Sequence, residues 1–179
     1  MIRIYPLAFI LLWSSAFITT KPIVDNSDPF SALAFRFFFV AVGFYLFSLY
    51  SKNSIIVKRR NLIESTFSGV LFHGFYLGGV FFSISIGMPA GIAALIVTLQ
   101  PILTNLLSGP ILKERITIKQ WVGALFGFVG AALVLGLDLG SEIPTKGLIA
   151  TVIALIAITS STIWQKKLSN NLPLSVSNF

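Results

Sequence analysis

The amino-acid sequence predicts an all-α, polytopic membrane helix bundle, and three observations lead to this fold class. Hydrophobic residues make up 55% of the 179 residues, and charged residues only 11%. The apolar residues gather into six long stretches separated by polar segments. Lys and Arg are abundant in every second segment, as in proteins whose loops alternate across a bilayer. A soluble core could not bury six such helices in a chain of this length.

Each stretch is close to the length of a membrane-spanning helix. About 20 residues, at about 1.5 Å per residue, cross about 30 Å of hydrocarbon. Because the stretches lack the period-two alternation of a transmembrane strand, helices are favoured. The predicted spans are Ile4–Thr20, Phe30–Tyr50, Phe67–Gly87, Pro89–Leu112, Ile118–Leu137 and Gly147–Trp164.

The first span has two interpretations. A basic start followed by an apolar run is also the pattern of a secretory signal peptide. Trp13 and Phe17, however, crowd the small residues at which such a peptide would be cleaved. A retained transmembrane helix is therefore favoured.

The third, fourth and fifth spans carry glycines suited to close packing. Small residues on one face let helices approach each other in lipid, where hydrophobic attraction between helices is weak. The segment 87–91 is so short that the third and fourth spans must form a tight antiparallel hairpin. The glycine pairs four residues apart are Gly74–Gly78, Gly87–Gly91, Gly123–Gly127 and Gly136–Gly140.

Positive charge collects on one side of the predicted bundle. If every stretch spans, ten of the 13 Lys and Arg residues fall on one side, and only Lys21 and Lys146 on the other. Basic loops stay in the cytoplasm. The pattern therefore predicts a protein of the cell (inner or plasma) membrane whose N-terminus is cytoplasmic. The net charge of +7 is thus a topology signal. It does not predict nucleic-acid binding, because the basic residues are split among short segments.

Polar side chains follow one face of the third span and one face of the fourth. Since these two helices are paired, both faces could line one water-accessible groove. The two faces comprise Gly69, His73, Tyr76, Val80, Ser83 and Gly87, and Ala93, Val97, Gln100, Thr104 and Ser108.

Pro101 lies in the middle of the fourth span, directly after Gln100. Proline removes one backbone hydrogen bond and frees the carbonyl of Val97, which kinks a helix. A half-broken helix beside a polar side chain suits a substrate site. The alternative is a structural kink in which Gln100 bonds to a neighbouring helix.

Two further side chains, His73 and Arg36, are candidates for the pathway. His73 titrates near neutrality, or it is a neutral residue that bonds across helices. Arg36 lies about two turns inside the second span. It either snorkels to the headgroups or faces the groove and pairs with an anionic substrate group.

No metal, cofactor or enzymatic activity is predicted. The chain has no Cys and a single His, and no carboxylate lies at membrane depth. Sequence motifs of serine hydrolases, zinc proteases and phosphate-binding loops are absent.

Motifs in a characteristic order resemble the EamA-type permeases of the drug/metabolite transporter superfamily, from about Leu7 to Gly136. They are Leu12-Trp-Ser-Ser15, Arg36-Phe37, Tyr76-Leu-Gly-Gly-Val-Phe-Phe-Ser-Ile-Ser85, Pro89-Ala-Gly-Ile-Ala-Ala-Leu-Ile96, Gln100-Pro-Ile102, Lys113-Glu-Arg-Ile-Thr117, Gln120-Trp-Val-Gly-Ala124 and Gly127-Phe-Val-Gly130.

The resemblance implies two inverted repeats of five helices around a cavity lined by helices that include the first, third, fourth and sixth. Trp13, His73, Tyr76 and Gln100 are the residues that it brings to the cavity. Glu114 corresponds to an acidic residue with a gating or structural contact. The implied function is a secondary transporter that exports small organic metabolites, such as amino acids or amphiphilic compounds, by alternating access.

The resemblance also implies a domain organisation. Residues 1–140 form the first five-helix unit, and residues 141–179 hold the sixth helix and the entry to a seventh, so the chain is interpreted as truncated. Two partners are considered, a missing C-terminal half or a second copy in a homodimer. A non-transporting integral membrane subunit, or an inactive product, is the alternative function.

Overall fold

A computed structural model describes residues 4–51, 58–113, 115–135 and 142–168 of the protein. Within these ranges the chain is helical and contains no strand, which confirms the predicted all-α class. The elements are α1 (Ile4–Asn26), α2 (Pro29–Tyr50), α3 (Arg59–Gly69), η1 (Val70–Leu77), α4 (Gly78–Ser85), α5 (Ala90–Val97), α6 (Gln100–Leu112), α7 (Ile118–Leu135) and α8 (Thr145–Leu168).

The helices have the dimensions of a polytopic membrane bundle. The segment η1 is π-helical and joins α3 and α4 into one long helix. Among the described residues, four helices are long and apolar enough to cross a membrane, and a shorter apolar helix lies at Ile118–Leu133. These four are Pro29–Tyr50, Arg59–Ser85, Ala90–Leu112 and Thr145–Lys167. For the first predicted span, the structure contains the helix α1, which continues to Asn26.

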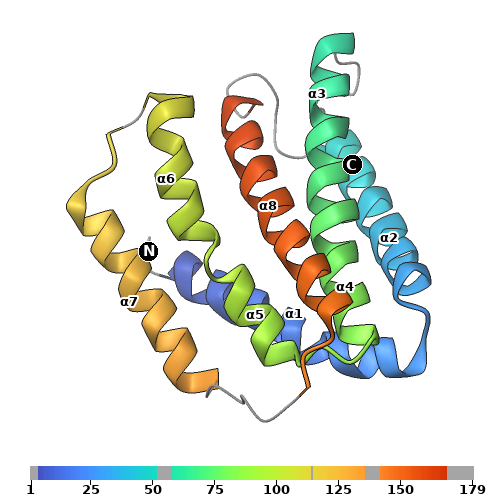
Figure 1. Ribbon diagram of the computed structural model, residues 1–179. Helices are drawn as coiled ribbons and strands as arrows, with labels where there is room; N and C mark the ends of the chain where they lie inside the picture. The colour runs from blue at the N-terminus through green and yellow to red at the C-terminus, as the bar shows by residue number, and fades with distance from the viewer. Residues whose placement is uncertain (1–3, 52–57, 114, 136–141, 169–179) are drawn as a thin grey trace.

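The helix α8 occupies the middle of the bundle, between α3–α4 on one side and α5–α6 on the other (Figure 1). Its small and apolar side chains complete the buried core. The sixth predicted helix therefore packs among the helices that precede it. Core residues include Tyr76, Val80 and Ile84 from η1 and α4, Ala93 and Val97 from α5, and Ala154, Ala157 and Ile158 from α8.

The turn between α4 and α5 spans residues 86–89 and produces the predicted antiparallel hairpin. Gly87 has a φ of +97°, a conformation that favours glycine. The Met88 N–H donates to the Ser83 carbonyl at 3.0 Å and closes the turn. The two helices diverge beyond this turn, and α8 packs between them (Figure 1).

Glycine permits a close approach between α4 and α8. A Cβ placed on Gly79 would lie 3.0 Å from the Ala150 carbonyl oxygen and 3.2 Å from the Ala154 Cβ. Of the glycines that the sequence singled out on α7, Gly123 and Gly127 have nothing within 4 Å of such a Cβ. Within the described chain, close packing therefore occurs at α8, and the glycine face of α7 is open.

Adjacent polar residues of α8 bond the helices on either side of it. The hydroxyls of Ser68 and Ser161 are 2.9 Å apart, and the Ser161 hydroxyl lies 3.0 Å from the Ser68 carbonyl. The Gln100 amide nitrogen donates to the Thr162 hydroxyl at 3.1 Å. Such bonds contribute about 0.6 to 2 kcal/mol each between membrane helices. They fix α8 against α3 and α6.

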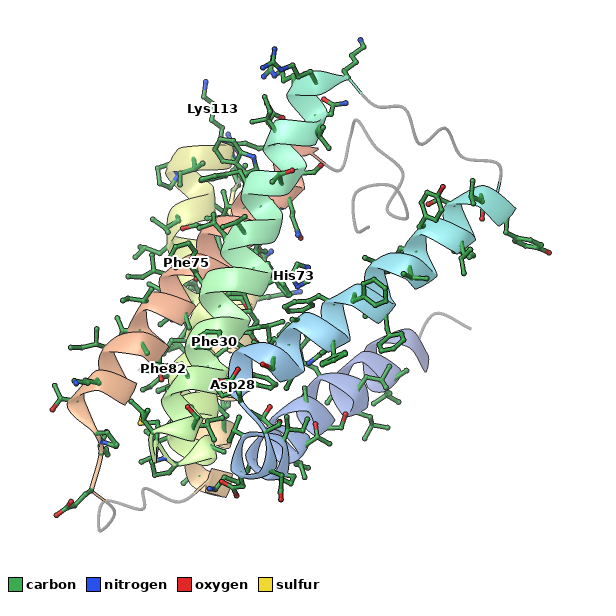
Figure 2. The ribbon with its side chains drawn as sticks, turned by 90° about the vertical axis from the view of Figure 1, so that its right-hand side faces the viewer. Asp28, Phe30, His73, Phe75, Phe82 and Lys113 are labelled. Carbon is green, nitrogen blue, oxygen red and sulfur yellow. The ribbon has the colours of Figure 1, made fainter. Side chains whose placement is uncertain are left out.

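The helices α1 and α2 lean away from the rest of the bundle (Figure 2). Near the start of α2, the Phe30 ring packs on the Phe82 ring of α4, with centroids 6.5 Å apart. Asp28 caps α2, because its carboxylate accepts the Ser31 N–H at 2.8 Å. The contact between Phe30 and Phe82 joins the base of the leaning pair to α4.

Candidate functional site

A cavity of about 200 Å³ lies between α1, α2 and the η1–α4 helix. Three of the residues predicted for the pathway, Trp13, Arg36 and Tyr76, line it together. The remaining lining residues are Leu12, Ala16, Thr20, Phe72, Leu77, Val80 and Phe81.

The helix α1 supplies four of the lining residues, Leu12, Trp13, Ala16 and Thr20. Trp13, Ala16 and Thr20 follow steps of three and four, which align side chains along a helix. Thr20 is buried, and its hydroxyl donates to the Ala16 carbonyl at 2.7 Å. The same periodicity in the sequence could have identified Thr20, which was not among the predicted site residues.

Aromatic rings form one wall of the cavity. The Trp13 and Tyr76 rings are nearly parallel, with an angle of 7° and centroids 6.4 Å apart. Phe72 meets both of them edge-on, at centroid distances of 6.4 and 5.3 Å. Tyr76 is 2% exposed and belongs to the buried core. The core therefore holds this wall in place.

Phe72, His73 and Tyr76 all lie within the π-helical segment η1. A π-helix has wider turns than an α-helix, and such segments are frequent at functional sites. On the polar face predicted with α-helical steps, Tyr76, Val80 and Ser83 are buried, whereas Gly87, which lies in the turn after α4, is exposed. The hydrophobic pattern of the sequence contains no signal for the π-helix.

His73 lies beside the cavity and does not line it. Its ring points toward α2 (Figure 2), where the Phe37 ring is 4.7 Å away between centroids. The centroid of the Phe72 ring is 5.1 Å from that of His73. The buried Nδ1 atom has no hydrogen-bond partner among the described residues. The predicted bond across helices is therefore not present at this nitrogen.

Among the described residues that line the cavity, Arg36 is the one that carries a charge. The ion pairs of the described residues are Lys21–Asp25 and Arg60–Glu64, and neither involves Arg36. Where the structure describes the chain, no carboxylate neutralises this guanidinium. The cavity therefore presents positive charge and aromatic surface.

Gln100 and Thr104 lie away from this cavity, on the helix that packs against α8. Gln100 bonds to Thr162, and the buried Thr104 hydroxyl has no partner among the described residues. The helix is interrupted at residues 98–99, just before Pro101. Glu114 lies outside the described residues.

Metal ligands are not gathered anywhere in the described ranges. No three His, Asp or Glu side chains come together there. The chemistry that the cavity offers is recognition through one cation and apolar contacts.

The EamA-like transporter family matches residues 3–136 of the chain. A "Probable amino-acid metabolite efflux pump" of Salmonella typhimurium is 24% identical over 168 residues, covering 93% of this chain and 54% of that protein. "Protein PecM" of Dickeya dadantii is 31% identical, with coverages of 87% and 50%. The "Uncharacterized transporter YyaM" of Bacillus subtilis is 28% identical, with coverages of 91% and 53%.

The chain thus spans about half the length of the curated relatives that it matches. No solved structure matches it.

Proposed function

Since the chain belongs to the EamA-like transporter family, we propose that its cavity is the solute site of a secondary carrier that exports small organic metabolites. The protein is a multi-pass membrane protein. The proposed cargo is an amino acid or an amphiphilic compound, moved by alternating access. One observation carries this proposal: Trp13, Arg36 and Tyr76, predicted from the sequence, converge on one cavity.

The cavity has the properties of a small-solute site. Binding sites are concave and mostly apolar, with a few placed polar groups. At about 200 Å³ it is smaller than the roughly 300–1,000 Å³ of drug-sized sites, which suits a small metabolite. The name of the Salmonella relative, "Probable amino-acid metabolite efflux pump", supports the same class of cargo. The transporter family likewise supports a role without enzymatic chemistry.

Two features support movement during transport. The leaning α1–α2 pair forms one side of the cavity, while the core-anchored η1–α4 helix forms the other. The interruption at residues 98–99 separates α5 from α6 and supplies a hinge. Hinges of a few residues absorb the rotations of domain movements.

We place the protein in the cell membrane with its N-terminus in the cytoplasm. Lys113 lies at the end of the bundle where α3 begins, opposite Asp28 (Figure 2). The described basic residues Arg59, Arg60, Lys166 and Lys167 belong to helix ends at the Lys113 side (Figure 1). The positive-inside rule assigns that end to the cytoplasm.

The partner that we propose is a second five-helix unit, either a further C-terminal half or a second copy of the chain. The open face of α7 supports this, because Gly123, Gly127 and Gly130 have nothing within 4 Å of their Cβ positions. Faces of small residues are the usual contact surfaces of membrane helices.

A non-transporting membrane subunit is the second candidate function. It is favoured by α8, which fills the space between the polar faces of the third and fourth spans. The Gln100 side chain is occupied there by Thr162.

The test is solute efflux from liposomes that contain the purified protein and labelled amino acids or amphiphilic compounds. We expect faster efflux of at least one solute than from protein-free liposomes. Trp13→Ala should slow that efflux about tenfold or more, equivalent to about 1.4 kcal/mol. Trp121→Ala is the matched control, because Trp121 is also half-buried but lies on α7, away from the cavity. A protein that moves no solute would favour the subunit.

A further inference from the structure

We propose that the cavity selects small organic anions with a flat apolar ring, namely arylalkanoates, over the corresponding amino acids and over organic cations. This inference rests on the proposed function, since it names the class of solute for the same site. Three properties of the cavity lead to it: its charge, its aromatic wall and the absence of an acidic group among the described residues of its lining.

The charge of the cavity comes from Arg36. This residue lies seven positions after Pro29, the first residue of α2, and so about 10 Å along the helix. An unpaired guanidinium at such a depth is unfavourable and tends to acquire a partner. None of the described carboxylates pairs with it. A ligand carboxylate would supply the partner, because arginine binds carboxylates through two parallel hydrogen bonds.

The aromatic wall favours a planar apolar body. Trp13 and Tyr76 present nearly parallel rings, and Phe72 presents its edge to both. Aromatic groups prefer offset-stacked or edge-to-face contacts, and this arrangement offers both. A cavity of about 200 Å³ has room for one ring with a short chain.

An ammonium group finds no carboxylate among the described residues that line the cavity. Their list contains neither Asp nor Glu. Aromatic faces alone would attract a cation. Arg36 opposes this attraction, because the like charges of a guanidinium and an ammonium repel each other. The cavity therefore favours a carboxylate without a nearby ammonium.

The preference can be measured as binding of three matched ligands to the full chain in detergent at neutral pH. The ligands are 3-phenylpropionate, its uncharged amide 3-phenylpropionamide, and phenylalanine, which adds an ammonium to the same skeleton. Trp121→Phe and Trp164→Phe leave Trp13 as the only tryptophan among the three of the chain, so its fluorescence reports on the cavity. We expect 3-phenylpropionate to bind about tenfold or more tightly than either analogue.

Substitution of Arg36 tests the origin of that preference. Arg36→Gln should remove the advantage of the acid over the amide and leave amide binding unchanged, and Arg36→Lys should retain part of the advantage. Arg115→Gln is the control, because Arg115 is exposed and outside the cavity. If Arg36→Gln fails to fold, the inference is still tested by the binding of the three ligands to the protein with Arg36 and to the Arg36→Lys variant.

Equal binding of the acid and the amide, tighter binding of phenylalanine, or an acid preference that survives Arg36→Gln would overturn the inference. Efflux measurements separate this failure from that of the proposed function. A carrier that exports solutes without charge preference leaves the function standing and removes the inference. Arg36-dependent binding without any efflux supports the inference and removes the carrier function.

Discussion

At the scale of single residues, small side chains decide where α8 can lie. Gly79 brings α4 against the backbone of α8 at Ala150, and Gly147 brings α8 against Met88, whose Cβ is 3.2 Å from the glycine's Cβ position. Ser161 and Thr162 then bond to the flanking helices. In lipid, apolar burial alone discriminates little between helix faces. Glycine contacts and hydrogen bonds therefore both determine which helix faces pack together.

We predict that Gly79→Ala destabilises the bundle. The added methyl group would press on a backbone carbonyl that α8 cannot easily move, and overpacking of this kind costs about 1–3 kcal/mol. Gly127→Ala is the control, because its methyl group meets open space and gains up to about 1 kcal/mol of helix propensity. Thermal unfolding in detergent should show a lower Tm for Gly79→Ala than for Gly127→Ala. Equal Tm values would contradict the close α4–α8 contact.

The sequence predicted some of the residues that line the cavity and not others, for physical reasons. Trp13, Arg36 and Tyr76 were expected on the pathway, and they do converge on one cavity. Gln100 was expected either on the pathway or bonded to a neighbouring helix, and in the structure it bonds to Thr162. That bond depends on the position of α8, which no local pattern specifies. Phe72 was missed because the π-helical register of η1 cannot be read from apolar spacing.

At the scale of the helices, α2 begins with a defined cap. The Ser31 backbone amide that donates to Asp28 lowers the pKa of this carboxyl below its ordinary value of 3.8. The ionised cap therefore contributes stability that is fully present above pH 3.8. The contribution is lost as the pH falls through the lowered pKa of the folded state.

Hydrogen exchange at the Ser31 amide tests this cap. Protection is the slowing of exchange at the Ser31 amide relative to its intrinsic rate at the same pH. At neutral pH we expect the unsubstituted protein to protect this amide more than Asp28→Ala does. Below the lowered pKa of Asp28, its protection should approach that of Asp28→Ala. In Asp28→Asn the amide oxygen caps the helix without ionising, so protection should not change with pH. Protection in the unsubstituted protein that is constant across this range would contradict the role of the carboxylate.

The helices themselves followed from the sequence more fully than their packing did. All six apolar stretches are helical in the described residues, because length and hydrophobicity are local properties. Pro101 predicted a kink in the fourth span, and the helix is interrupted at residues 98–99. The open glycine face of α7 and the central position of α8 depend on which helices meet. The sequence of one helix does not contain that information.

At the scale of the whole molecule, charged helix ends define two sides. Exposed Lys113 follows the end of α6, and exposed Glu142 precedes the start of α8, which lies at the other end of the bundle (Figure 1). The chain has no cysteine, so a single introduced thiol gives an unambiguous label. In intact cells, a membrane-impermeant maleimide should label Glu142→Cys, and should label Lys113→Cys only after permeabilisation. The reverse pattern would invert the proposed orientation.

The most direct test of the account is the thiol reactivity of two positions on α1 in the membrane-embedded protein. Ala16 lines the cavity, whereas Leu11 is 72% exposed and lies outside the cavity lining, on a surface that we assign to lipid. A thiol reacts as the thiolate, which forms only where water reaches it. We predict that Ala16→Cys reacts with a small water-soluble reagent and that Leu11→Cys, although more exposed, does not. An unreactive Ala16→Cys, or a faster reaction at Leu11→Cys, would contradict a water-accessible solute site between α1, α2 and η1–α4.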